Sequence, residues 1–398
     1  MTVGGAGTGV TGGRVPQGGW AISLDKLRRL EIRDGRAVAG AGISLLELQA
    51  AASATRQFYP PDPTERTASV GGSIATNASG SRSYRYGSTR RWIESMKVAF
   101  VDGRIVEYRR GDPIDFDVPE IPQPRTTKNT AGYPLRPGMD WIDLITGSEG
   151  TLAVVLEAEL RLLPAPEELL SGVLFFNDDD EALDAIDAWR GIEALRMIEY
   201  FDRNSLALLR ERYSEVPETA AAAVLIEQIG DDTAPWEDYA EGESWFAFTA
   251  ADRERFRAFR HALPERVNDL MRRRGFVKLG SDYAVPIASN REMLRLYHER
   301  LQAAALDYVI FGHIGDAHLH VNILPRSQEQ FELGKQVMVE FAGAAVAFGG
   351  TVSAEHGLGK RKSQLLPLQF GSDQIEAMKE VKRRLDPKWL LGRGNIFG

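Results

Sequence analysis

The stretch FGHIGDAHLHVNIL, residues Phe311–Leu324, holds three of the six histidines of the chain. Apolar residues lie on both sides of a Gly-Asp turn signal, and this pattern predicts a β-hairpin. Because side chains alternate faces along a strand, His318, His320 and Asn322 are expected to point the same way. His313, on the first strand of the hairpin, would then come back beside that polar row.

A second motif, GGTVSAEHGLG at Gly349–Gly359, carries Glu355 and His356 after another strand-like run. Imidazoles and one carboxylate on rigid strands are ligands that zinc, iron or manganese binds. A lone histidine near an apolar run is usually a core or surface residue. Three histidines within eight residues, beside a Glu-His pair between glycines, instead indicate a metal or catalytic site. The pattern specifies a site without specifying a reaction.

Composition narrows the class of protein. A chain of 398 residues predicts two or three domains, and the hydrophobic fraction of 43% with 26% charged residues is ordinary for a soluble globular protein. The net charge of −8 argues against a nucleic-acid binder. The absence of cysteine excludes disulfides, thiolate metal sites and iron–sulfur clusters held by this chain.

Targeting and membrane signals are missing from the sequence. No stretch approaches the roughly 20 apolar residues that a membrane-spanning helix needs. The first residues show neither a charged region nor an apolar region of a signal peptide. We therefore expect a cytoplasmic protein, with peripheral attachment at the inner membrane as the alternative.

The chain begins with the glycine-rich run VGGAGTGVTGG, Val3–Gly13. Such a loop lets backbone N–H groups approach phosphate oxygens closely. Gly7–Gly12 formally matches the dinucleotide fingerprint G-x-G-x-x-G, but we expect neither a strand before it nor a helix after it, which excludes a Rossmann interpretation. Against a flexible terminal linker, we favour a phosphate-binding loop.

The rest of the first half contains recognisable signals for a helix start, a hairpin and a linker. A capping box at Ser44–Glu47 predicts a helix that runs to about Gln57. The segment Phe58–Arg90 is almost free of periodicity, and so long an irregular segment inside a domain is usually functional or disordered. Trp92–Tyr108 indicates a hairpin, and Pro164–Pro166 a linker.

The second half alternates strands with helices. The acidic run Asp178–Glu181 is interpreted as a helix N-terminus favoured by the macrodipole, and not as a metal site. The basic run Lys360–Lys362 is interpreted as a solvated cluster. Strands are expected at residues 172–176, 221–227 and 245–249, and helices at 180–190, 252–274, 290–305 and 328–348.

Ten motifs in order carry a resemblance to a known family: GAGTGVTGG, YPPDPT, SVGGSIATNASG, YRYGSTR, KNTAGY, GSEGTL, SDYAVP, GHIGDAHLH, GGTVSAEHGLG and LDPKWLLGRGNIF. The chain resembles, over essentially its whole length, the FAD-linked oxidases of the D-lactate dehydrogenase, glycolate oxidase and D-2-hydroxyglutarate dehydrogenase family. The resemblance implies an α+β fold with an FAD-binding domain of the vanillyl-alcohol-oxidase type and a cap domain with an antiparallel sheet and flanking helices. The implied domains are residues 1–165, 166–384 and a C-terminal segment 385–398 that returns to the FAD site.

The resemblance also implies site residues. His313, His320 and Glu355 match the family's metal ligands, for zinc or alternatively iron or manganese, and His356 matches its proposed base. Arg260 matches a substrate-carboxylate anchor, Lys278 adds positive charge, and Asn322 holds the substrate or the metal shell. The residues matched to FAD binding are Gly5, Ala6, Gly7, Thr8, Gly9, Thr11, Gly12, Gly13, Pro61, Asp62, Ser69, Gly71, Gly72, Ala75, Gly87 and Asn395.

The implied reaction is the FAD-dependent oxidation of a D-2-hydroxy acid to the 2-oxo acid, with hydride passing to flavin N5. The chain has no cysteine and its histidines all lie at or after His261, so non-covalent FAD is expected. The implied partners are a small 2-hydroxy acid and an electron acceptor, either an iron–sulfur subunit, a cytochrome or the quinone pool. A homodimer is a further expectation.

Three departures from the family pattern stand out. The family has a βαβ unit before the glycine loop, so the sequence is expected to be an N-terminally shortened form. His318 stands where the family commonly has Asn, which implies either a different substrate shell or a fourth nitrogen near the metal. Gly392–Asn395 reads Gly-Arg-Gly-Asn in place of the commoner Asn-Pro-Gly-Lys.

Two alternatives remain open at this point. A metallohydrolase could use the same histidines and glutamate with a metal-bound water, although Gly5–Gly13 and Pro60–Gly87 would then be unexplained. A truncated, non-catalytic subunit of a redox complex is the other, and the missing βαβ unit is its only support.

Overall fold

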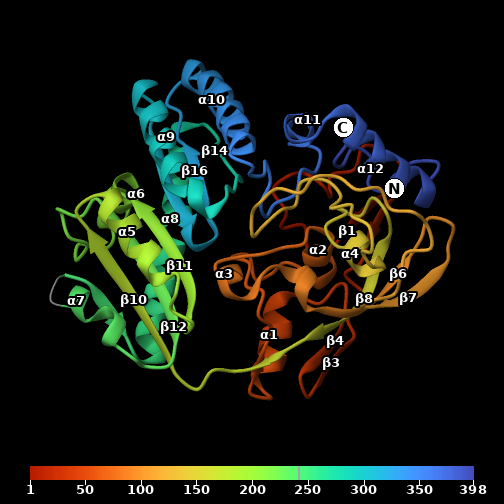
Figure 1. The fold of residues 1–398 in the computed structure, drawn as a ribbon, viewed down its shortest axis with the longest axis horizontal. Coiled ribbons are helices and arrows are strands. Elements are labelled where there is room, and N and C mark those ends of the chain that lie inside the picture. Colours follow the sequence, from red (N-terminus) through yellow and green to blue (C-terminus); the bar gives the residue numbers. More distant parts are fainter. Residues whose placement is uncertain (241–242) are drawn as a thin grey trace. The chain divides into compact units, whose positions relative to one another are not determined.

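The computed structural model describes residues 1–240 and 243–398, which form two compact units (Figure 1). The first unit consists of Met1–Gly80, Tyr86–Ala165 and Thr351–Gly398, and the second of Ser81–Arg85 and Pro166–Gly350. The chain leaves the first unit for its long excursion after Ala165. It returns to the first unit at Thr351.

The first unit is built on a five-stranded antiparallel sheet. Its strand order is β3 (Leu30–Arg33), β4 (Arg36–Gly40), β8 (Val154–Arg161), β6 (Ile93–Ala99) and β7 (Ile105–Arg109). Two small sheets join β1 (Thr2–Gly4) to β2 (Ala21–Ser23) and β5 (Gln57–Phe58) to β9 (Leu163–Pro164). Its helices are α1 (Leu45–Ser53), α2 (Val70–Ala75), α4 (Trp141–Ile145), α11 (Leu366–Gln369) and α12 (Ser372–Leu385), with single 3₁₀ turns at η1 (Thr89–Trp92) and η5 (Ser363–Leu365).

Helix α1 begins where its capping box predicts. The predicted capping box is present: the Ser44 side chain accepts from the Glu47 N–H, and the Glu47 side chain accepts from the Ser44 N–H. The helix ends at Ser53, before the expected Gln57, because Arg56 has a φ of 58° and Gln57 already belongs to β5. A left-handed residue cannot continue a right-handed helix.

The glycine-rich loop differs from expectation at its start. A short strand, β1, precedes it and pairs in parallel with β2. Three residues at the beginning of a chain are too few for periodicity to reveal a strand. After the loop, turns lead to β2 and not to a helix. A Rossmann motif needs a helix at this point, so the loop is not a Rossmann motif.

A buried ion pair closes the C-terminal part of the first unit. The Lys382 ammonium donates to Asp386 at 2.5 Å, to the Thr151 carbonyl at 2.6 Å and to the Leu391 carbonyl at 3.0 Å. Both side chains are almost completely buried. This single cation therefore connects α12, the loop before β8 and the C-terminal tail.

We predict that Lys382→Met lowers the free energy of unfolding by about 3–5 kcal/mol, because it leaves the Asp386 carboxylate buried without its cation. Denaturant unfolding measures the effect, with Lys388→Met at a nearby exposed position as the control. Equal stability of the two variants would contradict this assignment.

The second unit is built on a seven-stranded antiparallel sheet, as expected for the cap domain. Its strand order is β13 (Trp245–Ala247), β10 (Leu169–Phe176), β12 (Ala222–Ile229), β11 (Leu195–Asp202), β15 (Tyr308–His313), β16 (His318–Ile323) and β14 (Leu279–Gly280). The helices are α5 (Asp179–Trp189), α6 (Arg203–Arg210), α7 (Glu237–Ala240), α8 (Ala250–Arg274), α9 (Asn290–Ala303) and α10 (Gln328–Ala347), with 3₁₀ turns η2 (Ala234–Trp236), η3 (Ile287–Ser289) and η4 (Ile314–Asp316). Helix α3 (Ser83–Tyr86) contains a crossing between the units.

Two predictions for this unit are confirmed. Strands β15 and β16 form the expected hairpin, with His313 paired to His318 and Phe311 to His320. The acidic run is a helix start, since the Asp178 side chain accepts from the Glu181 N–H at the beginning of α5.

Apolar packing covers both faces of the sheet next to this hairpin. On one face, Phe201 and Val309 belong to a core with Phe259 and Leu263 of α8. On the other face, α9 and α10 lie beside the β14–β16 end of the sheet (Figure 1). The hairpin is therefore held from both sides, which fixes the direction of every side chain along it.

Candidate active site

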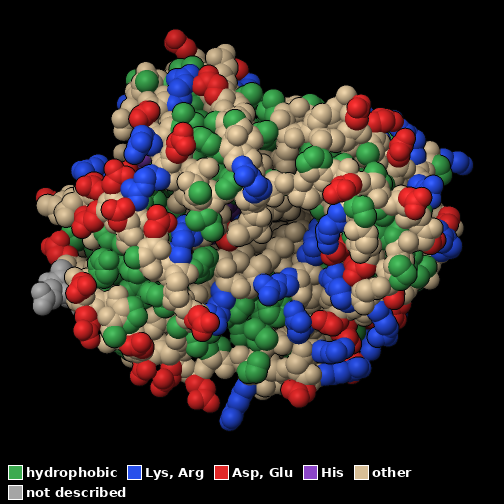
Figure 2. Space-filling model, in the orientation of Figure 1, with side chains coloured by type: hydrophobic (Ala, Val, Ile, Leu, Met, Phe, Trp, Pro, Cys, Tyr) green, Lys and Arg blue, Asp and Glu red, His purple; other side chains and the backbone are tan. Residues whose placement is uncertain are grey.

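The three histidines of the β15–β16 hairpin lie together on the face of the sheet covered by α8. Their ring centroids are 5.4 Å apart for His313 and His318, 5.4 Å for His313 and His320, and 4.5 Å for His318 and His320. Their ligand-capable nitrogens lie within 4.8 Å of one another. Little histidine surface is visible on the face drawn in Figure 2, in keeping with the burial of His313 and His318.

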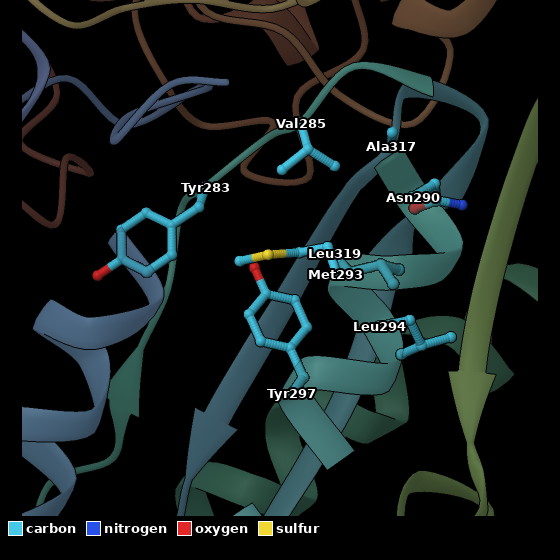
Figure 3. Close-up of a pocket in the computed structure, with 8 residues that line it drawn as sticks. All are labelled: Tyr283, Val285, Asn290, Met293, Leu294, Tyr297, Ala317 and Leu319. Atoms are coloured by element: carbon cyan, nitrogen blue, oxygen red, sulfur yellow. The ribbon is translucent and has the colours of Figure 1, made fainter. Parts of the chain in front are cut away.

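The opposite side of the hairpin is packed against α9 (Figure 3). Leu319 points toward Met293 and Tyr297, and Tyr283 closes the same space. That space has no room for a water molecule. It is therefore not a ligand pocket; it is the apolar support that keeps β16 and its histidines in place.

The orientation of His313 is set by a buried carboxylate. Its Nδ1 atom bonds Glu199 Oε1, while Glu199 Oε2 accepts from Arg260 Nε at 2.7 Å. Burial would raise the pKa of Glu199, but the charges of Arg260 and His313 outweigh it and hold that pKa well below its usual range. The ionised Glu199 accepts the Nδ1 hydrogen of His313, so Nε2 is the ring nitrogen left to face a ligand.

His320 is oriented by a backbone carbonyl. Its Nδ1 atom lies 3.3 Å from the Ser281 carbonyl oxygen, so Nε2 is left to face a ligand here as well. Ser281 is itself fixed to β16, since its N–H donates to the Val321 carbonyl and its hydroxyl accepts from the Val321 N–H. Asn322 is buried, and its amide donates to the His320 carbonyl at 3.4 Å.

Two predicted cations also belong to the second unit. Arg260, expected as a substrate anchor, places its Nε on Glu199 and so supports His313. Lys278 is half-buried between α8 and β14, and burial lowers its pKa. A contact of either cation with a substrate stays a prediction.

Glu355 and His356 belong to the first unit, where they follow the chain's return. Glu355 Oε1 accepts from the buried Lys128 ammonium at 2.7 Å and from the Ser79 hydroxyl at 3.0 Å. Lys128 also donates to the Gly80 carbonyl at 3.1 Å. The His356 carbonyl accepts from Thr11, which ties this segment to the glycine loop.

The glycine loop is shaped by close contacts. A Cβ on Gly5 would lie 2.1 Å from Ser69 Oγ, and Ser69 Oγ also accepts from the N–H groups of Ala6 and Gly72. Gly7 has a φ of 80°, which favours glycine. The predicted cofactor residues Gly5, Ala6, Ser69 and Gly72 are thus brought together.

The C-terminal return reaches this region through Asn395, which was among the expected cofactor residues, and through Lys360, which was not. Lys360 was expected in a solvated cluster, but its ammonium donates to the Gly13 carbonyl at 2.9 Å and to Asn395 Oδ1 at 2.7 Å. Asn395 in turn donates to the carbonyl of Glu149 at 3.0 Å. Lys360 and Gly13 are 347 positions apart, so no local pattern could have indicated this contact.

Glu149 is a second missed residue. Its carboxylate accepts from the N–H groups of Leu358 and Gly359, each at 2.7 Å, and its own N–H donates to the Ala75 carbonyl. Burial raises the pKa of Glu149 to about 7, although the two N–H groups and Lys360 act in the opposite direction. The sequence shows Glu149 only as part of the motif GSEGTL, which does not reveal that its hydrogen-bond partners are Leu358 and Gly359.

The other predicted cofactor residues are more scattered. Gly71 packs against Ala41, and Asp62 lies with its carbonyl against Gly80. Gly87 has a φ of 72°, and Pro61 is buried. The structure gives no contact that joins Gly87 or Pro61 to the glycine loop within the described residues.

Comparison with known proteins assigns both units. Residues 1–109 match the profile described as FAD binding domain, and residues 165–396 match FAD linked oxidases, C-terminal domain. The chain belongs to the FAD-linked oxidase family. It is an oxidoreductase, and its first unit contains the FAD-binding domain.

Curated relatives of this FAD-linked oxidase match it over nearly its whole length. It is 30% identical to a D-lactate dehydrogenase of Anaerostipes hadrus, over 100% of this chain and 84% of the relative. Identity is 30% to a D-2-hydroxyglutarate dehydrogenase of Xanthomonas citri pv. viticola (98% and 82%) and 28% to glycolate oxidase subunit GlcD of Bacillus subtilis (99% and 83%).

A solved structure supports the fold alone. Alkyldihydroxyacetonephosphate synthase superposes with a TM-score of 0.68 at 15% identity, over 98% of this chain and 70% of that one. Among the described residues of the FAD-linked oxidase, no helix has the length and apolarity needed to cross a membrane.

The residues around the glycine loop fit the pyrophosphate of FAD. The Arg14 guanidinium lies against Gly7, and Lys360 reaches Gly13, so two cations border a loop with closely spaced backbone N–H groups. Such a combination of N–H groups and positive charge binds phosphate oxygens. Arg14 was not singled out from the sequence, and Lys360 was interpreted there as part of a solvated cluster.

We predict that Gly359→Ala weakens FAD binding by roughly tenfold or more, about 1.4 kcal/mol. The new Cβ would come 2.3 Å from the Thr11 carbonyl oxygen and displace the glycine loop. Gly138→Ala is the matched control, because Gly138 also has a positive φ but no neighbour within 4 Å. The ratio of flavin to protein absorbance reports binding; equal FAD content in the two variants would refute the assignment.

A pH dependence follows from Glu149. With a pKa of about 7 in place of 4.5, the folded state binds this proton more tightly than the unfolded chain does. The free energy of unfolding should therefore fall by roughly 3 kcal/mol as pH rises from about 4.5 to 7. Urea unfolding of the FAD-free chain measures it, and Glu149→Gln should flatten the profile while Glu120→Gln at an exposed position should not. Parallel profiles for all three proteins would overturn this expectation.

Proposed function

We propose that this FAD-linked oxidase oxidises a small D-2-hydroxy acid to the corresponding 2-oxo acid. The observation that carries the proposal is the buried histidine cluster, with its carboxylate support, in a chain that also has an FAD-binding domain. The names of the relatives give the substrate class: D-lactate, D-2-hydroxyglutarate and glycolate. FAD, when bound, supplies the hydride acceptor at its N5 atom.

The proposed metal ligands are His313, His320 and Glu355, with zinc as the first candidate and iron or manganese as alternatives. The donor set supports this, because Glu199 and the Ser281 carbonyl leave Nε2 of the two histidines to face a ligand. Glu355 is oriented by Lys128 and Ser79 through one carboxylate oxygen. A divalent cation, when bound there, would polarise the substrate hydroxyl and lower its pKa.

The remaining steps belong to the protein's own side chains. His356 is proposed to take the hydroxyl proton at a ring nitrogen, which allows C2 to give up its hydrogen as hydride. Arg260 and Lys278 are proposed to attract the substrate carboxylate, and Arg260 is held in place for this by Glu199. Asn322 is proposed to hold the substrate or the metal shell from the histidine face.

Non-covalent FAD attachment is part of the proposal. The chain has no cysteine, and residues 1–165 contain no histidine. His356 does enter the first unit through the C-terminal return, and it is assigned to proton transfer. The proposed electron acceptor is an iron–sulfur subunit, a cytochrome or quinone. An iron–sulfur cluster would have to be bound by another chain, because this one has no cysteine.

The hydrolytic alternative is not retained. Both units match profiles of FAD-linked oxidases, and a metallohydrolase would leave the contacts of the glycine loop with Ser69 and Lys360 without a purpose.

We predict that D-lactate, glycolate or D-2-hydroxyglutarate bleaches the flavin absorbance of the FAD-loaded enzyme under anaerobic conditions, and that L-lactate does not. His356→Asn should slow the bleaching by about 10²–10⁴-fold because the general base is removed. FAD content should be unchanged, and His298→Asn, at a histidine of α9, serves as the control.

Rapid-mixing absorbance at the flavin band measures these rates. Unchanged bleaching in the His356 variant would remove that residue from the proton transfer. An absence of bleaching with all three acids would contradict the proposed substrate class.

A further inference from the structure

We infer that His318 is a third imidazole ligand of the proposed metal centre, with Asp282 as the acceptor that orients it. The inference rests on the proposed function, since it concerns the same metal centre, and it extends the ligand set beyond His313, His320 and Glu355.

The register of the sheet directs His318 toward the other two histidines. Ala317 and Leu319 both face the apolar space beside α9 (Figure 3). Because side chains alternate along a strand, His318 projects to the opposite face, where it is directly paired with His313 across the hairpin. His313 faces His318 across the hairpin, and His320 lies two residues further along the same face of β16. The three imidazoles therefore lie together at one end of β16.

The spacing of the nitrogens suits one ion. Two nitrogens that each lie 2.0–2.1 Å from a tetrahedral zinc are roughly 3.3 Å apart. The ligand-capable nitrogens of His313, His318 and His320 are within 4.8 Å of one another without any ion present. The nitrogens therefore have to approach one another by up to about 1.5 Å when an ion binds.

Asp282 forms an ion-pair contact with His318, whereas Glu199 is hydrogen-bonded to His313. Asp282 Oδ1 lies 3.3 Å from His318 Nε2, and both side chains are completely buried. The bridge between Ala284 and His318 continues the pairing of β14 with β16, and it holds the segment after β14 beside the histidines. With its hydrogen on Nε2, next to the carboxylate, His318 would present Nδ1 to the ion.

A purely structural role explains this arrangement less well. Burying an ionisable pair away from water costs free energy, and an apolar pair of similar volume is often at least as stable. The rings of His318 and His320 are in direct contact, with their centroids 4.5 Å apart. A shared ion accounts for the burial of both the carboxylate and the imidazoles.

The first test is zinc K-edge X-ray absorption on the zinc-loaded, FAD-containing enzyme, which counts imidazole ligands without any substitution. Three imidazoles are expected. Two imidazoles would overturn the inference and leave the proposed function intact, whereas a wild-type enzyme that binds no zinc, iron or manganese would remove both the metal-assisted function and this inference.

The second test compares dissociation constants for Zn²⁺ after chelation and dialysis. His318→Asn should raise the dissociation constant by at least 10-fold, and Asp282→Asn by about 10–100-fold, the usual effect of losing a supporting acceptor. His298→Asn, in the same unit but on α9, should leave it unchanged.

The same variants separate a ligand from a residue that only lines the substrate. If His318 contacts substrate alone, His318→Asn changes KM while the zinc dissociation constant and the absorption spectrum of the zinc site stay as in the wild type. That result would overturn the inference.

Discussion

The carboxylate of Glu199 is the constraint on which the second unit's site depends. It is buried on β11 and receives Arg260 from α8 and His313 from β15, so it connects three elements that are far apart in the sequence. The covering helix, the central strand and the hairpin are thereby fixed relative to one another. The same pair of contacts keeps Glu199 ionised and determines which nitrogen of His313 is left to face a ligand.

The first unit depends on a comparable connection between chain ends. The carbonyl of Thr11 accepts from the N–H groups of Lys360 and Arg361, and Glu149 accepts from those of Leu358 and Gly359. The segment that carries Glu355 and His356 is therefore joined directly to the glycine loop.

Sequence reasoning recovered what is encoded locally. Alternation along β16 identified the common face of His318 and His320, and the capping box identified the start of α1. It missed interactions whose partners are remote, above all Glu199 with His313 and Lys360 with Gly13. Glu199 and Lys360, taken alone, resemble ordinary surface charges, and only the fold reveals that Glu199 is buried and that both are paired.

The domain boundaries illustrate the same limit. The linker near Pro164–Pro166 is visible because proline changes the local texture of the sequence. The return at Thr351 has no comparable sequence signal. Helix α10 ends at Ala347, and Thr351 already donates a hydrogen bond to Asn129 of the first unit. Which unit a segment joins is decided by long-range hydrogen bonds, and these leave no periodic signal.

The central claim is that the C2 hydrogen of a D-2-hydroxy acid reaches the flavin of this oxidase. The most direct measurement is the rate of anaerobic flavin bleaching with the preferred acid, compared with the same acid deuterated at C2. We predict that deuteration slows the bleaching, because the C2–hydrogen bond is broken in the step that reduces the flavin. Bleaching at equal rates in a step shown to be limited by chemistry, or a flavin that stays oxidised, would contradict the account.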